Sequence, residues 1–393
     1  MKKLLVYWPY FQHYHLARLL SLKKSCDASG IQLVALALSR QSSDLHKSVD
    51  CPDIAELVYL DSIGNLAEST DVRLVKFIRE IKPDCALING YAESASRIIL
   101  IEALRHRIGA VLMSDSKQDD SPRSFLKERF KQALVSSFGG AVVASRHASA
   151  YLKVLGLPQE YHYKPYDVVD NVYWAKPAPK VSGEYILSIG RFIPKKNFVK
   201  LIQAYAQVLK RSSHPLPSLR LIGAGPEEAL LKNLVQSLAL SNNVSIEPYR
   251  EPDELRQIYQ GARLFVLASD HEEQWGLVVN EAMAAGVPVI ASEKIGAVPD
   301  LLENRVTGLT FDPYLVSSIA AALEQALKEP EQMQTLRVQA HARLRKQFSC
   351  EKFAEAAIEA AKTASSRQSA IKSSWIDALI LKLFALLAKR TSI

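Results

Sequence analysis

Short apolar runs alternate with amphipathic segments along the first half of the chain. The apolar runs are 4–7, 31–38, 57–60, 85–88, 110–113 and 141–144. Segments with apolar positions at helical spacing lie between them, at 15–24, 72–81, 94–106, 124–135 and 148–155. Strands that alternate with helices in this way build a parallel sheet wrapped by helices. The pattern therefore predicts an α/β domain in this half.

The alternation is interrupted once and then starts again. The segment 176–183 contains two prolines and a glycine and is typical of a linker. Apolar runs in the second half are 185–189, 219–222, 244–246, 264–267, 287–291 and 309–311, and helical segments at 317–327, 329–348 and 351–363 come last. A chain of 393 residues can hold two such domains. We predict two doubly wound Rossmann-like domains, 1–178 and 183–348, which bind ligands at the carboxyl ends of their strands and face a shared cleft.

Composition narrows the class of protein. Apolar residues make up 48% and charged residues 23% of the chain, as in soluble globular proteins. No apolar run reaches the ~18 residues needed to span a bilayer, and the first residues do not resemble a secretory signal. The four cysteines are scattered and have no metal-like spacing, which indicates a reducing compartment. We expect a cytoplasmic protein, with peripheral attachment to the cytoplasmic face of a membrane as an alternative.

The net charge of +8 is distributed unevenly. Residues 1–182 hold 24 Lys and Arg against 19 Asp and Glu, residues 183–363 hold 20 against 21, and residues 364–393 hold 5 against 1. The positive excess therefore lies on the first domain and on the end of the chain. Such surfaces attract anionic lipid or nucleic acid. Nucleic acid is the poorer choice, because no recognisable binding module accompanies the charge.

The stretch 273–292 is the strongest candidate for a binding site. A loop turns into a helix at Trp275, Gly276 and Leu277, and Gly286 with Pro288 stops that helix before a short strand. The first amides of the helix, including that of Val278, have no intrahelical partner, so they can hold an anion such as a phosphate. Glu273 lies in the loop ahead of the helix and Glu281 about one turn into it. Both carboxylates can accept hydroxyls of one ligand whose phosphate lies between them.

The motif EEQWGLVVNEAMAAGVPVIAS resembles the donor-site signature of the retaining glycosyltransferases of family 4, glycosyl transferases group 1, which have the GT-B fold. Together with SIGRFIPKKNFVKLIQAY, the similarity covers about residues 185–315. The resemblance implies that Glu281 binds the ribose of a nucleotide and Glu273 a hydroxyl of the transferred sugar. It implies that Arg191 and Lys196 bind the donor phosphates, and that a helix at 349–365 returns to the first domain.

Arg191 and Lys196 also fit this role by their chemistry. They follow an apolar strand that ends at Gly190, and fixed cations stabilise the charge that builds on a leaving diphosphate. A solvated loop is the alternative for the pair taken alone. Asn197 stands after the lysine, where the family most often has a glycine, and asparagine also tolerates a left-handed backbone.

Two further loops are expected to border the nucleotide. Gly223 and Gly225 resemble part of a dinucleotide fingerprint, but the third glycine is missing, so a strand-to-helix turn beside the nucleotide fits better than a nicotinamide site. Tyr249 follows the next strand and is placed to border the base, although an ordinary loop is an equal alternative.

The residues expected to bind the acceptor are less well defined than those expected to bind the donor. Many relatives have paired glycines after the first strand, whereas this chain has none before Gly30. His13 and His15 in that loop can line an acceptor pocket or cap and pack the first helix. By the resemblance, Asp115 is the nearest match to a residue beside the reacting carbon. Asp119 and Asp120 do not form the Asp-x-Asp metal motif, so we expect no metal and no other cofactor.

Two basic segments leave several alternatives open. Arg123, Lys127 and Lys131 recur every four residues and share one helical face, which fits a solvated helix or a basic surface. The tail at 366–393 is basic and amphipathic. It can lie in a membrane interface, pack on the protein, or pair with another chain.

The expected function is transfer of a hexose-type sugar, with retention, from a UDP- or GDP-sugar to a saccharide or lipid-linked acceptor in cell-surface polysaccharide or glycolipid biosynthesis. Two alternatives remain at this point: a nucleotide-sugar epimerase of the same fold, and a non-catalytic binding protein on the same scaffold.

Overall fold

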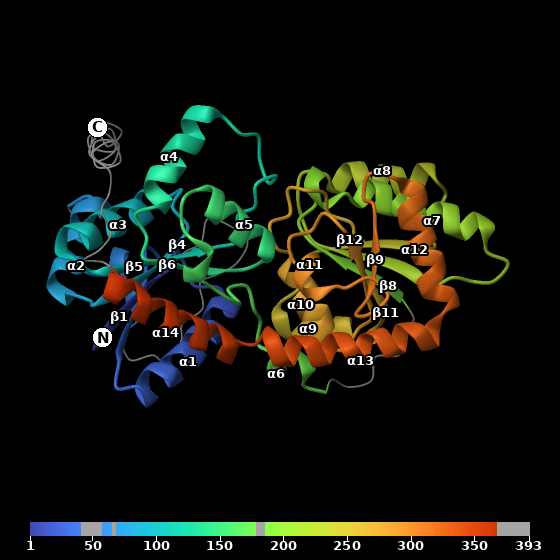
Figure 1. The fold of residues 1–393 in the computed structure, drawn as a ribbon. Coiled ribbons are helices and arrows are strands. Elements are labelled where there is room, and N and C mark those ends of the chain that lie inside the picture. The colour runs from blue at the N-terminus through green and yellow to red at the C-terminus, as the bar shows by residue number, and fades with distance from the viewer. Residues whose placement is uncertain (41–56, 65–67, 178–184, 368–393) are drawn as a thin grey trace. The chain divides into compact units, whose positions relative to one another are not determined.

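The computed structural model describes residues 1–40, 57–64, 68–177 and 185–367, which form two compact units (Figure 1). Within these residues, unit 1 comprises the parts of 1–118, 122–168 and 350–367, and unit 2 comprises 119–121 and 169–349. The division falls at Val168 and Val169, earlier in the chain than the expected break at 178–183. Most of the expected linker, and the basic tail from residue 368 onward, lie outside the described residues.

Unit 1 is built on a parallel sheet of seven strands in the order β3-β2-β1-β4-β5-β6-β7. The strands are β1 (Lys3–Tyr7), β2 (Gln32–Ala37), β3 (Leu57–Tyr59), β4 (Cys85–Asn89), β5 (Gly109–Ser114), β6 (Gly140–Val143) and β7 (His162–Tyr163). The helices are α1 (His13–Ala28), η1 (Leu60–Ser62), α2 (Thr70–Ile81), α3 (Ser94–His106), α4 (Phe125–Val135), α5 (Arg146–Val154), η2 (Gln159–Tyr161) and α14 (Cys350–Arg367). The strand order reverses between β1 and β4, as in doubly wound folds.

The last described helix, α14, packs on the sheet of unit 1 although it comes at the end of the chain. Most of its alanines are buried, and Gly109 at the start of β5 and Gly139 directly before β6 allow the close approach. A Cβ added to Gly139 would lie 2.7 Å from Cα of Ala364, and one added to Gly109 would lie 2.9 Å from the backbone nitrogen of Ser365. Small residues on both sides therefore determine how near α14 comes to the sheet.

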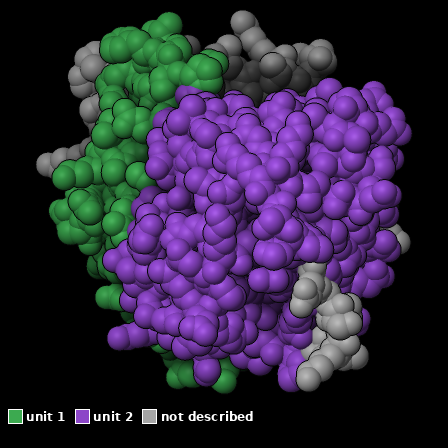
Figure 2. Space-filling model, turned by 90° about the vertical axis from the view of Figure 1, so that its right-hand side faces the viewer, with its two compact units in different colours: residues 1–118, 122–168, 350–393 green, residues 119–121, 169–349 purple. Residues whose placement is uncertain are grey.

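Unit 2 repeats the architecture with six parallel strands in the order β10-β9-β8-β11-β12-β13 (Figure 2 colours the units separately). The strands are β8 (Tyr185–Ile189), β9 (Ser218–Ile222), β10 (Val244–Glu247), β11 (Ala262–Leu267), β12 (Val289–Ser292) and β13 (Leu309–Phe311). The helices are α6 (Asn171–Ala175), η3 (Pro194–Lys196), α7 (Phe198–Arg211), α8 (Glu228–Ser237), α9 (Pro252–Gly261), α10 (Leu277–Ala284), α11 (Val298–Leu301), α12 (Val316–Lys328) and α13 (Pro330–Gln347).

The predicted fold class, α/β with two doubly wound parallel sheets, is confirmed. The inner strands of each sheet are apolar and mostly buried, because helices cover both faces, whereas the edge strands β3, β7 and β10 are only partly buried. Among the described helices, none is long and apolar enough to cross a bilayer.

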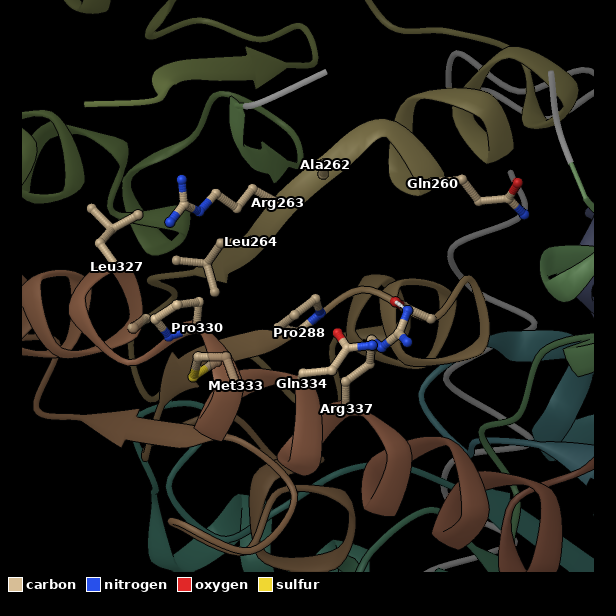
Figure 3. A pocket seen from close by; sticks show the side chains of 12 residues that line it. Gln260, Ala262, Arg263, Leu264, Pro288, Leu327, Pro330, Met333, Gln334 and Arg337 are labelled. Carbon is tan, nitrogen blue, oxygen red and sulfur yellow. Dashed lines mark hydrogen bonds between the residues drawn. The ribbon is translucent and has the colours of Figure 1, made fainter. Parts of the chain in front are cut away.

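A pocket of about 280 Å³ lies in unit 2 at the amino-terminal edge of β11 and β12 (Figure 3). Arg263 and Arg337 line it together with Gln260 and Gln334. Arg337 donates to the carbonyl oxygen of Gly286 at 3.1 Å, so it ties α13 to the turn after α10. This edge is opposite to the one from which the predicted site residues extend.

Candidate functional site

The predicted residues of the second domain gather at the carboxyl edge of the sheet of unit 2. The loop after β8 and the loop after β11 are joined there by their backbones, since the amide of Asp270 donates to the carbonyl oxygen of Lys195 at 2.9 Å. Asn197 adds two bonds from its side chain, to the carbonyl oxygens of Ala268 at 3.1 Å and Pro313 at 2.9 Å. Its φ of +57° confirms the predicted left-handed backbone. The two loops therefore form one framework.

Lys196 and Glu273 form an ion pair between these two loops. Each side chain is only 11% exposed. Burial raises the pKa of Glu273, but attraction to the ammonium groups of Lys196 and Lys195 outweighs it, so the pKa lies below its ordinary value. Glu273 is therefore a carboxylate at neutral pH, in a place that solvent barely reaches.

Gly190 makes room for this lysine. A Cβ added to Gly190 would lie 3.3 Å from Cδ of Lys196, so the lysine stem runs across the glycine. Arg191 stands beside it and is exposed, and its side chain has no hydrogen bond or ion pair with any residue that the structure describes. The loop after β8 thus presents one cation held by Glu273 and one that projects into solvent.

Gly276 turns the chain into α10. Its φ is +92°, and an added Cβ would lie 3.1 Å from Cγ2 of Ile295 and 3.2 Å from Cδ2 of Leu267, so both its backbone and its surroundings require glycine. Within the described part of the chain, the amides of Leu277 and Val278 have no acceptor. The start of α10 therefore offers free donors, as the sequence predicts.

Trp275 has its side chain in the core. The side chain is buried, its indole N–H donates to Oδ1 of Asn280 at 2.8 Å, and its ring lies 6.1 Å from that of Phe348. Its carbonyl oxygen accepts from the amide of Ala297. Trp275 thus anchors the loop that carries Glu273, and it was predicted as a donor-site residue without this structural role.

Glu281 lies one turn into α10 and is buried. The hydroxyl of Tyr259 donates to its Oε2 at 2.9 Å. Burial raises the pKa of Glu281 to about 7, although the bond from Tyr259 lowers it. Burial, and next the charge of Glu281, raises the pKa of Tyr249 to about 12. The predicted residues Tyr249 and Glu281 therefore lie close enough to interact electrostatically.

Gly223 and Gly225 are required for contact between two backbones. A Cβ added to Gly223 would lie 1.9 Å from the carbonyl oxygen of Gly190, and one added to Gly225 would lie 2.5 Å from that of Phe192. The amide of Phe192 donates to the carbonyl oxygen of Ala224 at 2.9 Å. These glycines hold the loop after β9 against the loop that carries Arg191.

Sequence reasoning missed two residues that position the site. A Cβ added to Gly296 would lie 1.6 Å from the carbonyl oxygen of Gln274, and its amide donates to the carbonyl oxygen of Glu273 at 3.2 Å. Tyr259, the hydroxyl donor to Glu281, was also missed. The glycine after the strand β12 was a signal that could have been used, whereas nothing in the sequence pairs Tyr259 with Glu281.

His13 and Asp115 belong to unit 1, not to the unit that holds the other predicted residues. His13 begins α1 after β1, and Asp115 directly follows β5, so both lie at the carboxyl edge of that sheet. Asp115 is near enough to Tyr14 and Tyr166 to influence their pKa. His15 accepts from the amide of Gln12 at 3.2 Å and its ring lies 5.0 Å from that of Trp8, so of its two readings the capping and packing one is confirmed. Burial holds the pKa of His15 well below its ordinary value.

Among the described residues, no three or more His, Cys, Asp or Glu side chains are arranged to hold a metal ion. In unit 2, the cations of the loop after β8 and the free amides at the start of α10 can bind an anion.

Residues 173–343 match the family model for glycosyl transferases group 1. The chain is 29% identical to an exopolysaccharide phosphotransferase of Streptomyces coelicolor over 319 residues, which are 77% of this chain and 31% of that protein. It is 32% identical to a D-inositol 3-phosphate glycosyltransferase of Rhodococcus erythropolis over 184 residues, 45% of this chain and 41% of the relative. The alignments thus span less than half the length of these curated relatives.

The described architecture also resembles that of HepE from Anabaena, crystallised in complex with UDP. The TM-score is 0.69 with 18% identity, over 91% of this chain and 99% of that one. This likeness concerns the fold alone. The protein has the GT-B fold of two doubly wound Rossmann-like domains.

Proposed function

We propose that the protein is a retaining glycosyltransferase that moves a hexose-type sugar from a UDP- or GDP-sugar to a saccharide or lipid-linked acceptor. The observation that carries the proposal is the buried Lys196–Glu273 pair beside the free amides of α10, with Glu281 one turn further. All of these residues lie within the region that matches glycosyl transferases group 1. HepE, which shares the fold, has been crystallised with UDP and with UDP-glucose, which supports a nucleotide-sugar donor.

The donor would be held by three kinds of group. Arg191, Lys196 and the amides of Leu277 and Val278 face the diphosphate. Glu273, held ionised by Lys196, accepts a hydroxyl of the sugar. Glu281 accepts the ribose hydroxyls beside Tyr249, and Gly190, Gly223 and Gly225 shape the adjoining loops.

The reaction needs charge stabilisation more than a protein nucleophile. As the bond from the sugar to the diphosphate breaks, negative charge builds on the departing oxygen, and fixed cations and amides stabilise it without reorganising. In the route proposed for retention, the acceptor attacks on the same face and the departing diphosphate takes its proton. His13 and Asp115 of unit 1 are proposed to bind the acceptor. Neither a metal nor another cofactor is part of this route.

The proposed setting is cell-surface polysaccharide or glycolipid biosynthesis at the cytoplasmic side of a membrane. The epimerase and the non-catalytic binding protein remain the rival functions. An epimerase converts its donor without an acceptor, and a binding protein releases no nucleotide at all.

The test is release of free UDP or GDP from a panel of nucleotide sugars, chosen first by thermal shift. Release that depends on an added saccharide or lipid-linked acceptor is the expected result. Conversion of the sugar without any acceptor would favour the epimerase, and binding of a nucleotide sugar without turnover would favour the non-catalytic binding protein.

A further inference from the structure

The first turn of α4 exposes two large apolar side chains next to each other. Phe125 is 82% and Leu126 78% exposed, more than any other large apolar residue of the described chain. Further along the helix, Phe130 packs against the core of unit 1, and Ala133 and Leu134 are buried. Leu126 lies one turn before Phe130, so the apolar stripe of α4 continues beyond the core it packs on. Figure 1 shows this end of α4 projecting from unit 1.

Cations flank this apolar pair, and the one acidic side chain in the sequence of the helix already accepts hydrogen bonds from other residues. Lys127 is exposed, and its side chain has no hydrogen bond or ion pair with a residue that the structure describes. Arg129 is exposed and donates to Gln132 at 3.0 Å. Glu128, the one acid in the sequence of α4, accepts from Lys131 at 2.9 Å and from the hydroxyl of Tyr151 at 2.8 Å. The outward surface of the first turns therefore combines apolar groups with positive charge.

Neither feature stabilises the free protein in water. Exposed aromatic and aliphatic groups forgo burial, and a lysine in the first turn lies at the positive end of the helix dipole. An anionic bilayer interface satisfies both, because the apolar groups enter the acyl boundary while the cations meet lipid phosphates. A protein partner fits less well, since the cores of protein interfaces are depleted in lysine.

We propose that the first turns of α4, with Phe125, Leu126, Lys127 and Arg129, dock unit 1 on an anionic lipid bilayer. The loop into α4 leaves the sheet at its carboxyl edge, directly after β5, where Asp115 also lies and where α1 begins with His13. The bilayer would meet the edge assigned to the acceptor. In that respect the inference rests on the proposed function and selects a lipid-linked acceptor over a soluble one, while the docking itself does not depend on any activity.

The experiment is vesicle flotation of the full chain. Vesicles of phosphatidylcholine alone are compared with vesicles that also contain phosphatidylglycerol. The variant is Phe125→Glu with Leu126→Glu, and its matched control is Leu230→Glu with Val338→Glu, on α8 and α13 of unit 2, where the apolar side chains are 51% and 59% exposed. Circular dichroism and calorimetric titration with UDP accompany each protein, so that folding and the donor site are followed separately.

The wild type and the control are expected to float with the anionic vesicles, and the α4 variant to bind them about tenfold or more weakly, because membrane affinity scales with the apolar area inserted. UDP affinity is expected to be equal in all three. Flotation of the α4 variant at the wild-type level, or of no protein at all, would overturn the proposal. The proposal would also be overturned if light scattering showed that the wild type is a dimer and that the α4 substitutions dissociate it. A second copy of the chain would then cover Phe125 and Leu126. If the wild type did not bind UDP, this would count against the proposed function and leave the docking result unaffected.

Discussion

Glu273 and Glu281 belong to one short stretch of chain, yet their environments shift their pKa values in opposite directions. Both carboxyls are buried, and burial alone raises the pKa of each. Lys196 and Lys195 reverse the shift at Glu273, whereas Glu281 has Tyr259, a neutral donor, beside it. One carboxylate is therefore ionised in the free protein, and the other titrates near neutrality.

We predict that the Glu281→Ala variant binds the free nucleotide more weakly by about 1 to 3 kcal/mol, the cost of losing a hydrogen bond to a charged group. In the wild type the affinity should fall as the pH is lowered through about 7, because a protonated Glu281 accepts ribose hydroxyls less well. Calorimetric titration at several pH values measures both effects. Equal affinity of wild type and variant would exclude the ribose role.

The same group makes stability depend on pH. The pKa of Glu281 in the folded protein, about 7, lies above its ordinary value of 4.5, so between these values the folded state binds more protons than the unfolded state. Stability from this group is present below about pH 4.5 and is lost as the pH rises to about 7, by about 3 kcal/mol in total. The Glu281→Gln variant should lack this loss in urea unfolding at a series of pH values, with Glu272→Gln as an exposed control. If stability depended on pH equally in the Glu281→Gln variant and in the wild type, Glu281 would be ionised in the folded protein throughout the range from about pH 4.5 to 7.

The Lys196→Ala variant should lose about 100-fold or more in turnover, the scale expected for one group that stabilises transition-state charge. Its folding stability should change less, although Glu273 would lose a buried partner. The Lys196→Ala, Glu273→Gln double variant removes that unpaired charge and separates the two effects. Turnover within a few fold of wild type in Lys196→Ala would show that this lysine does not meet the diphosphate.

At the scale of elements, the loops after β8 and β9 each contain a glycine with a different role. Gly223 is needed for folding, whereas Gly190 is needed for the site. The Gly223→Ala variant would place a Cβ 1.9 Å from a backbone oxygen, so we predict destabilisation of at least about 2 kcal/mol. In Gly190→Ala the Cβ would instead meet the flexible stem of Lys196 at 3.3 Å, so this variant should fold and lose activity. Thermal unfolding and turnover of the two variants test the contrast. Similar stability of both would contradict it.

The hydrophobic pattern predicted most strands and helices, because apolar runs of buried parallel strands and amphipathic helices differ in period. It missed β7, whose two residues, His162 and Tyr163, give no period to detect. In the candidate site, Gly276, Glu281 and Asn197 could be predicted from spacing and turn chemistry. Tyr259 could not, because its bond to Glu281 joins α9 to α10 across 22 positions and depends on how the two helices pack. The role of Trp275 could not be predicted either, since a core side chain and a ligand contact look the same in a sequence.

At the scale of the whole molecule, we predict that transferase activity survives EDTA. Arg191, Lys196 and the amides at the start of α10 are the groups proposed to balance the diphosphate charge, and none of them needs a metal to act. Turnover with and without EDTA, followed by addition of Mg²⁺ or Mn²⁺, measures this. Activity that EDTA abolishes and either metal restores would bring Asp119 and Asp120 back as candidate ligands.

From its sequence, we predict that the basic tail makes a second contact with the membrane, in addition to that of the first turns of α4. The deletion should begin at residue 368, because Arg367 still belongs to α14, donates to the carbonyl oxygen of Gly139, and lies 3.2 Å from the centre of the Tyr161 ring. Lys and Arg near an anionic surface contribute about 1 kcal/mol each, and salt screens this attraction. Removal of 368–393 should therefore weaken binding to anionic vesicles in low salt and leave nucleotide affinity unchanged. The binding that remains after the deletion should depend less on salt, because the apolar pair of α4 acts through burial and only Lys127 and Arg129 act through charge. It should disappear when Phe125 and Leu126 are also replaced by Glu. Equal flotation of the full and shortened chains would mean that the tail packs on the protein and does not bind the membrane.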